Sequence, residues 1–150
     1  MKKKTVIELL PYQAPFLFVE ELTYISENKF EGYYTFKNDE YFYKGHFKDN
    51  PVTPGVILIE VMAQIGVVCM GIYLLRKNFS EIKKPQIALT SSEVDFLIPV
   101  KPKDRVKVIS EKIYFRFNKL KCNVKLFNEK NELVCKGTIS GMFKIIINET

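Results

Sequence analysis

The sequence predicts an α+β fold in which an antiparallel β-sheet is wrapped around one long central helix. Residues 56–75 are apolar on every side and carry only one charge, Glu60, and one amide, Gln64. Segments rich in aromatic and β-branched residues, which are typical of strands, lie on both sides of this helix. Because a helix without a polar face has to be covered by other elements, a curved sheet around it is the expected architecture.

The central helix is expected to begin at Thr53 and Pro54, because threonine can cap an N-terminus and proline suits the first helical position. Arg76 at the far end suits the negative pole of the helix dipole. Gly66 and Gly71 lower the stability of a helix relative to alanine, so we expect another element to pack closely against them.

A membrane span is the alternative interpretation of this segment, because about 20 apolar residues cross a bilayer. A single span would leave the strand patterns on both sides unexplained. It would also place a carboxyl and an amide in the middle of the membrane, where both are costly. We therefore predict a buried core helix and no membrane span.

The other elements follow in chain order, with a short helix and two strands before the central helix and four long strands after it. The expected ranges are 4–10 for the helix and 16–26, 30–36, 86–98, 105–117, 119–127 and 133–147 for the strands. Residues 77–85 are expected to form a polar loop. The 150 residues, 1–150, are predicted to form a single domain with a sizeable core.

Composition and charge narrow the class of protein. The chain is 47% hydrophobic and 27% charged, as globular domains are, and its three cysteines have no metal-binding spacing. We expect the cysteines to be small apolar fillers in a reducing compartment, and hence a cytoplasmic protein. The apolar run after the N-terminal lysines is too short for a signal peptide. Despite the net charge of +6, no nucleic-acid motif or basic helix is present, so no nucleic-acid partner is expected.

His46, Gly55 and Glu60 lie close together in the sequence and form the candidate site. A buried carboxyl without a cationic partner has a raised pKa and can keep its proton near neutral pH, as a general acid must. His46 is the natural base, because the pKa of an unperturbed imidazole is about 6.5. Gly55 places a backbone N–H at the helix N-terminus, where a carbonyl oxygen that gains negative charge is stabilised. Gln64 follows Glu60 by four residues, on the same helix face.

Each of these residues also has a structural interpretation. A lone histidine is more often structural than catalytic, and Gly55 could serve close packing alone. Glu60 is harder to explain in this way, because an ionised carboxylate without a partner is costly in an apolar helix. The prediction of a site therefore depends on the combination of the three residues.

In this combination the chain resembles the 3-hydroxyacyl-[acyl carrier protein] dehydratases of the hotdog fold. The resemblance spans nearly the whole chain, and its most specific part is the sequence GHF followed by PVTPGVILIEVMAQ at this spacing. The matching residues are 9–11, 15–17, 45–47, 51–52, 54–56, 59–64, Phe96, Pro99 and Asp104. Three positions depart from the family pattern: Tyr12 replaces a histidine, Lys48 a proline and Thr53 a methionine. None of the three removes a catalytic group.

The resemblance implies a reaction and a role for each candidate residue. The reaction is the dehydration of a 3-hydroxyacyl thioester to the trans-2-enoyl thioester. His46 is implied as the catalytic base, Glu60 as the catalytic acid, and Gly55 N–H as the donor to the thioester carbonyl. Gln64 is implied as the partner that orients Glu60. No metal or redox cofactor is expected, since the substrate is carried on the phosphopantetheine of acyl carrier protein.

The resemblance also implies partners. Acyl carrier proteins are acidic, so Lys44 and Lys48 beside His46 are candidates for docking, although a solvated lysine surface is an equal alternative. The family implies a homodimer with a continuous sheet, in which His46 of one subunit meets Glu60 of the partner subunit, or a trimer of such dimers. The acyl chain is expected in an apolar tunnel between the helix and the sheet.

Two other functions are compatible with the sequence. A hotdog thioesterase would need a carboxylate that activates water, and a non-catalytic acyl-carrier-binding subunit would need no acid–base pair. The sequence leaves open whether the pathway makes fatty acids, lipid A precursors, aryl polyenes or polyketides. It also leaves open whether the protein has isomerase activity and whether it works with a second, different dehydratase subunit.

Overall fold

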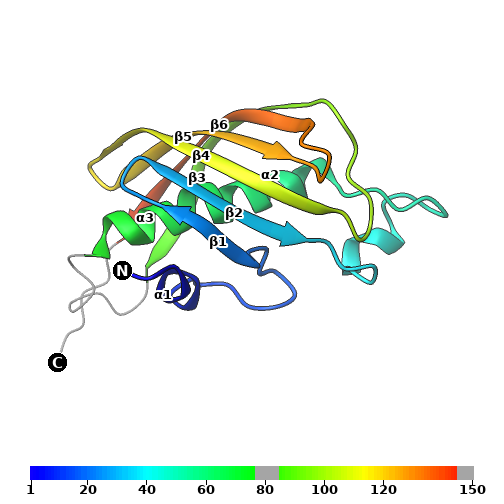
Figure 1. Ribbon diagram of the computed structural model, residues 1–150, viewed down its shortest axis with the longest axis horizontal. Helices are drawn as coiled ribbons and strands as arrows, with labels where there is room; N and C mark the ends of the chain where they lie inside the picture. The colour runs from blue at the N-terminus through cyan, green and yellow to red at the C-terminus, as the bar shows by residue number, and fades with distance from the viewer. Residues whose placement is uncertain (77–84, 145–150) are drawn as a thin grey trace.

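The computed structural model describes residues 1–76 and 85–144, which form a six-stranded antiparallel sheet and one long helix against its inner face (Figure 1). The strand order in the sheet is β1-β2-β4-β5-β6-β3. The predicted α+β class, with an antiparallel sheet wrapped around a central helix in the hotdog arrangement, is confirmed.

The elements agree with the predicted order of a short helix, two strands, a long helix and four strands. The helical elements are α1 (Lys3–Glu8), η1 (Tyr41–Lys44), α2 (Gly55–Ala63), η2 (Gln64–Val68) and α3 (Cys69–Leu74). The strands are β1 (Glu21–Ile25), β2 (Lys29–Thr35), β3 (Gln86–Phe96), β4 (Arg105–Arg116), β5 (Lys119–Phe127) and β6 (Leu133–Lys144). Most of the expected loop at 77–85 and residues 145–147 of the expected last strand lie outside the described residues.

The first strand is shorter than predicted, because the chain enters it only at Glu21 and not at Phe16. The backbone of residues 16–18 bonds to a helix side chain instead of a strand. Phe18 N–H donates to Gln64 Oε1 at 2.8 Å, and Gln64 Nε2 donates to the carbonyl oxygen of Phe16 at 3.0 Å. This segment therefore crosses the helix rather than extending the sheet.

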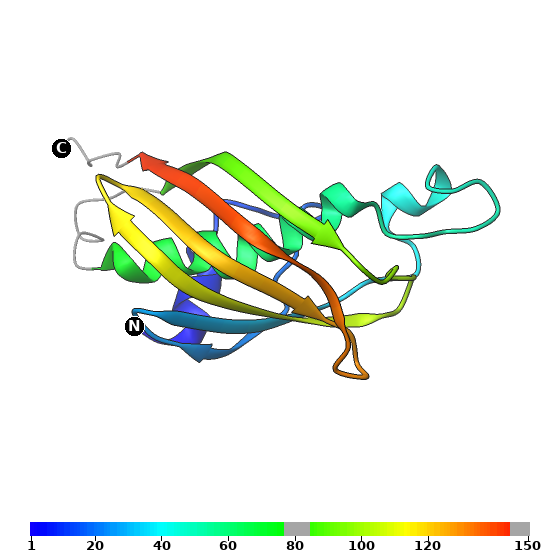
Figure 2. The ribbon, with the colours of Figure 1, turned by 90° about the horizontal axis from the view of Figure 1, so that it is seen from above.

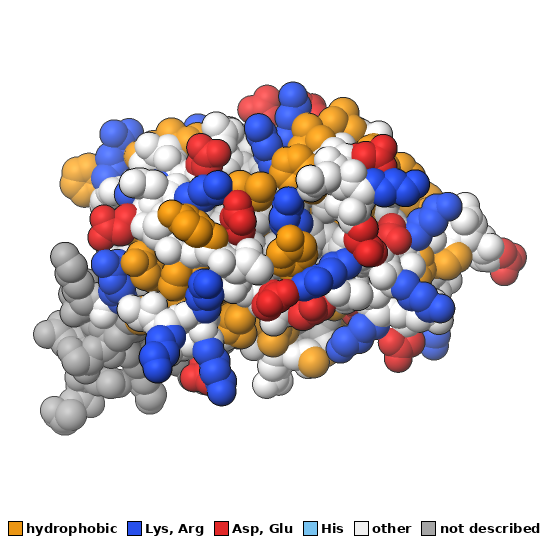
Figure 3. All heavy atoms as spheres, in the orientation of Figure 1, with side chains coloured by type: hydrophobic (Ala, Val, Ile, Leu, Met, Phe, Trp, Pro, Cys, Tyr) orange, Lys and Arg blue, Asp and Glu red, His pale blue; other side chains and the backbone are white. Residues whose placement is uncertain are grey.

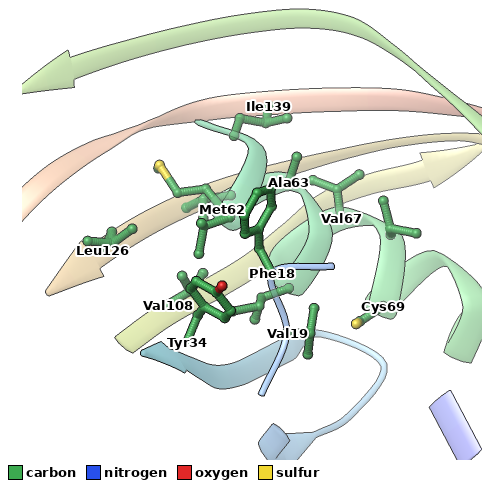
Figure 4. Packing of buried hydrophobic residues seen from close by; sticks show 14 of the residues in the cluster. Phe18, Val19, Tyr34, Met62, Ala63, Val67, Cys69, Val108, Leu126 and Ile139 are labelled. Carbon is green, nitrogen blue, oxygen red and sulfur yellow. The ribbon is translucent and has the colours of Figure 1, made fainter. Parts of the chain in front are cut away.

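The core lies between the central helix and the inner face of the sheet. Strands β2 and β5, and the first half of β4, alternate between fully buried and less buried positions, as strands with one face on the core do. Figure 4 shows Met62 and Val67 of the helix among Val108, Leu126 and Ile139 of the sheet. The helix is long and apolar enough to cross a membrane, but most of it is buried in the protein, so it is a core helix.

The two helix glycines lie where the sheet approaches most closely, as predicted. A Cβ added at Gly71 would lie 1.8 Å from Cζ of Phe143 on β6. At Gly66 it would lie 2.9 Å from Cβ of Ser110 on β4. Neither position has room for a side chain unless the sheet moves.

The three cysteines are free and buried, which confirms that they fill space in the core. They belong to three different elements: Cys69 to α3, Cys122 to β5 and Cys135 to β6. Burial raises the pKa of Cys122 to about 11 and that of Cys135 to about 12. Both thiols therefore stay protonated and unreactive near neutral pH.

Two features of the fold determine where a site can form. The loop between η1 and α2 extends beyond the end of the sheet, as Figure 2 shows. Strand β3 lies at one edge of the sheet and pairs only with β6 among the described strands. The helix N-terminus, the loop and the last residues of β3 meet at this end of the molecule.

Candidate active site

His46 lies in the loop between η1 and α2, half-buried. Its Nδ1 is 2.8 Å from the carbonyl oxygen of Val52. Because a carbonyl oxygen can only accept a hydrogen bond, Nδ1 carries the proton of the neutral ring and Nε2 keeps its lone pair. The Phe47 ring stacks on the imidazole, with ring centroids 4.0 Å apart and planes at 26°. The ring is thus held in the tautomer in which Nε2 can accept a proton.

The helix begins one residue later than expected. Pro54 has extended backbone angles and precedes the first helical residue, Gly55. The Thr53 hydroxyl does not cap the helix, because it bonds to the hydroxyl of Tyr43 at 2.6 Å. The first helical hydrogen bonds are donated by Ile57 and Leu58 to the carbonyl of Pro54. The predicted positions of the cap and of the first helical residue are therefore wrong by one residue.

Gly55 presents its backbone N–H at the helix N-terminus. Within residues 1–76 and 85–144, this N–H donates to no protein acceptor. The ring of Phe96, at the end of β3, lies over the glycine, because a Cβ added there would be 3.1 Å from its Cζ. Gly55 therefore serves close packing as well as presenting an unpaired donor at the positive pole of the helix dipole.

Glu60 and Gln64 lie on successive turns of the helix and bond to each other. Gln64, which is fully buried, donates from Nε2 to Oε2 of Glu60 at 3.0 Å. Its other bonds, to the backbone of Phe16 and Phe18, fix the amide between the helix and the crossing segment. The structure thus brings Gln64 against the carboxyl that it is expected to orient.

The environment of Glu60 favours its neutral form. Burial raises the pKa of Glu60, and the hydrogen bond from Gln64 lowers it by a smaller amount. None of the ion pairs between the described residues includes Glu60. The pKa of Tyr12 is raised mainly by burial and to a smaller extent by the charge of Glu60. A carboxyl in this position can keep a proton and donate it.

The structure of one chain shows no contact between His46 and Glu60 that would complete the candidate site. Among the described residues, no hydrogen bond or ion pair joins them. One surface cavity, of about 220 Å³, is lined by Leu17, Tyr34 and Glu40 and includes neither His46 nor Glu60. The acyl tunnel and the pairing of His46 with Glu60 therefore stay predictions.

Three features of this region were not predicted. Residues Gln64–Val68 form a turn of π-helix, an irregularity that is frequent at functional sites. Ser110 on β4 donates to the carbonyl oxygen of Gly66, inside this turn, at 2.9 Å. The third feature is the bond between Tyr43 and Thr53. Only the threonine gave a sequence signal, since it replaces the methionine usual before Pro-Gly.

On the face drawn in Figure 3, the basic side chains do not gather in one patch. Figure 3 shows Lys and Arg side chains spread over the visible face and interspersed with acidic ones. Lys44 and Lys48, the predicted docking residues, are exposed on the two sides of His46. In the part of the chain that the structure describes, no three His, Cys, Asp or Glu residues are grouped as metal ligands.

Comparison with known proteins gives matches over most of the chain. A family model described as the FabA-like domain matches residues 10–136. The chain is 34% identical over 135 residues to the 3-hydroxyacyl-[acyl-carrier-protein] dehydratase FabZ of Caldicellulosiruptor bescii, which covers 89% of this chain and 92% of that protein. The FabZ of Clostridium perfringens is 34% identical over 149 residues and covers 97% of this chain and 99% of that protein.

Solved structures share the fold at lower sequence identity. The dehydratase heterocomplex ApeI:P from Xenorhabdus doucetiae matches with a TM-score of 0.77 at 15% identity, over 93% of this chain and 90% of that chain. A hypothetical thioesterase with coenzyme A from Streptococcus pneumoniae TIGR4 matches with a TM-score of 0.63, also at 15% identity, over 83% and 85%. Identities this low establish a common fold and do not distinguish the two activities.

Proposed function

This chain belongs to the FabA-like domain family, and we propose from that premise that it dehydrates 3-hydroxyacyl thioesters of acyl carrier protein to trans-2-enoyl thioesters. The observation that carries the proposal is the state of Glu60. Its carboxyl has a raised pKa, has no cationic partner among the described residues and is held by Gln64. Such a carboxyl supplies a proton to a leaving hydroxyl, which dehydration requires.

In the proposed mechanism, His46 removes a proton from C2 of the substrate through Nε2. The negative charge that develops on the thioester oxygen is stabilised by Gly55 N–H and the helix dipole. Glu60 donates its proton to the 3-hydroxyl, which leaves as water while the double bond forms between C2 and C3. Transfer of a proton from His46 to Glu60 restores the starting state. The step involves no net oxidation, so it requires no redox cofactor.

The oligomer we propose is a homodimer in which two edge strands β3 pair and each site takes His46 from one subunit and Glu60 from the partner subunit. Strand β3 is exposed at nearly every position, although it is 11 residues long. Long exposed edges of this kind are ordinarily covered or paired. Large apolar side chains are also exposed at the end of the molecule where the helix N-terminus, the His46 loop and the last residues of β3 meet, namely Phe47, Val56, Phe96 and Leu97. A partner subunit would cover them.

The partner that delivers the substrate is proposed to be acyl carrier protein, in the cytoplasm. Its negative charge would be attracted to Lys44 and Lys48, which are exposed next to His46. The thioesterase alternative is disfavoured, because the raised pKa of Glu60 favours a neutral acid over a water-activating carboxylate. The non-catalytic alternative is disfavoured because both acid–base positions are filled.

A panel of 3-hydroxyacyl carrier proteins of varied chain length, read by mass spectrometry for loss of water, tests the reaction. Glu60→Gln and His46→Ala should each lower kcat by a factor of about 100 or more while the fold stays intact. Glu111→Gln removes an exposed carboxylate from β4 and serves as the matched control. Near-normal turnover by either site variant, or release of a free thiol in place of water, would overturn the proposal.

A further inference from the structure

Two buried hydroxyl groups close the base of the loop that carries His46. Tyr43 lies in η1, just before the loop, and Thr53 lies in the last part of the loop, just before α2. Their hydroxyl oxygens lie 2.6 Å apart, and the two residues are only 6% and 4% exposed. Because burial raises the pKa of Tyr43 to about 12, the phenol keeps its proton and can take part in the bond near neutral pH.

The peptide unit between Val52 and Thr53 connects this pair to the imidazole. Its carbonyl oxygen, on Val52, lies 2.8 Å from His46 Nδ1, whereas its N–H, on Thr53, donates to the carbonyl oxygen of Val100 at 2.8 Å. A peptide unit is planar, so the two ends cannot turn independently. Any rotation of Thr53 that breaks its bond to Val100 therefore also moves the acceptor that orients the histidine ring.

The rest of the loop is bonded within itself. Val52 N–H donates to the carbonyl oxygen of His46 at 2.8 Å. Phe47 and Asn50 exchange a pair of backbone hydrogen bonds of 2.9 and 3.0 Å. The loop can thus move as a preformed unit, and its direction depends on how its two ends are attached to the body of the protein.

We propose that Tyr43 and Thr53 are positioning residues for His46, because their hydroxyl pair fixes the Val52–Thr53 peptide and, through it, the tautomer and direction of the imidazole. The inference rests on the proposed role of His46 as the base. Thr53 has three restraints: its N–H bond to Val100, its attachment to the start of the helix, and the hydroxyl bond to Tyr43. Loss of the hydroxyl removes one of these restraints, so the peptide can turn further and the imidazole can exchange its proton between the two nitrogens more readily.

The test uses the fact that His46 is the only histidine in the chain. Nitrogen NMR of the labelled, full-length protein therefore reports the tautomer of this imidazole from a single pair of signals. In the wild type, the neutral ring should carry its proton mainly on Nδ1. Thr53→Val and Tyr43→Phe should each give a mixture of tautomers, whereas Thr53→Ser, which keeps the hydroxyl, should behave as the wild type. Tyr73→Phe on α3, far from the loop, is the control.

Turnover is measured on the same proteins. Thr53→Val and Tyr43→Phe should lower kcat about tenfold with little change in KM, the size expected for one lost buried hydrogen bond. The double variant should lower kcat no further, because both substitutions remove the same bond. Thermal unfolding of each variant is measured as a control that it is folded.

The inference is overturned if both variants keep the wild-type tautomer, whether or not kcat falls, or if Thr53→Ser fails to restore it. This result is distinguishable from failure of the proposed function. If His46→Ala retained turnover, the role of His46 as base would be wrong. The tautomer measurement would still decide whether Tyr43 and Thr53 orient the ring.

Discussion

At the scale of single residues, Glu60 matters because its neutral and ionised forms do different chemistry. The apolar surroundings of the helix predict a raised pKa, and burial in the folded chain acts in that direction. The spacing of four residues also predicts the contact with Gln64. The bonds from Gln64 to the 16–18 segment could not be predicted, because they join positions about 46 residues apart in sequence.

The raised pKa of Glu60 makes the stability of the protein depend on pH. Between the pKa values of the unfolded and folded chains, the folded chain binds more protons. The contribution of Glu60 to the free energy of unfolding is therefore fully present below its pKa in the unfolded chain. It is lost as pH rises through its pKa in the folded chain. Urea unfolding at a series of pH values should show the wild type losing stability relative to Glu60→Gln as pH rises. A wild type that kept or gained stability relative to Glu60→Gln as pH rises would contradict this.

Gln64→Leu should lower the free energy of unfolding by about 2–4 kcal/mol, because it leaves one buried and one partly buried backbone group without a partner. Phe18 N–H loses its acceptor, and the carbonyl oxygen of Phe16 loses its donor. The variant should also raise the pKa of Glu60, since the bond from Gln64 lowers it. Chemical denaturation measures the first effect, with the exposed Gln86→Leu as control. Equal stabilities of the two variants would refute the structural role.

At the scale of elements, periodicity predicts the strands that have one buried face, such as β5, to the residue. It fails where a side chain takes the place of a neighbouring strand, as Gln64 does for residues 16–18. It also gives no indication of the π-helix at η2, because an all-apolar helix has no polar stripe whose shift could be detected. The stabilising contact there is the hydrogen bond from Ser110 to Gly66.

Gly71→Ala should destabilise the protein by about 1–3 kcal/mol, although alanine is the better helix former. The added Cβ would overlap the ring of Phe143, which is itself buried. Gly45→Ala is the matched control, since nothing lies within 4 Å of an added Cβ there. Thermal and urea unfolding compare the two. A Gly71→Ala protein as stable as the control would mean that β6 moves away freely.

At the scale of the whole molecule, the sequence predicts the layers and the class of chemistry, but within the described part of one chain no bond joins the two halves of the candidate site. His46 lies on the projecting loop and Glu60 on the helix, with no bond between them among the described residues. Composition and periodicity report how a chain buries its own residues. They contain no information on which edge or apolar patch a second copy would cover, so the prediction of a dimer came from resemblance alone.

Dimerisation through β3 predicts that a charge on its exposed edge weakens the assembly. Leu89 on β3 is 44% exposed, and Leu89→Asp should shift sedimentation towards the monomer at low protein concentration. Ile113 on β4 is similarly exposed, at 47%, but lies away from this edge, so Ile113→Asp should sediment as the wild type. An unchanged assembly in Leu89→Asp would place the interface elsewhere.

Complementation between two inactive variants tests most directly whether His46 and Glu60 act together across the dimer. His46→Ala and Glu60→Gln are each expected to be inactive alone. Refolded together in equal amounts, they form mixed dimers in which one site has both intact residues. About a quarter of the wild-type dehydration rate should then return, because half of the dimers are mixed and each has one working site of two. A mixture that stays as inactive as the separate variants would contradict the shared site.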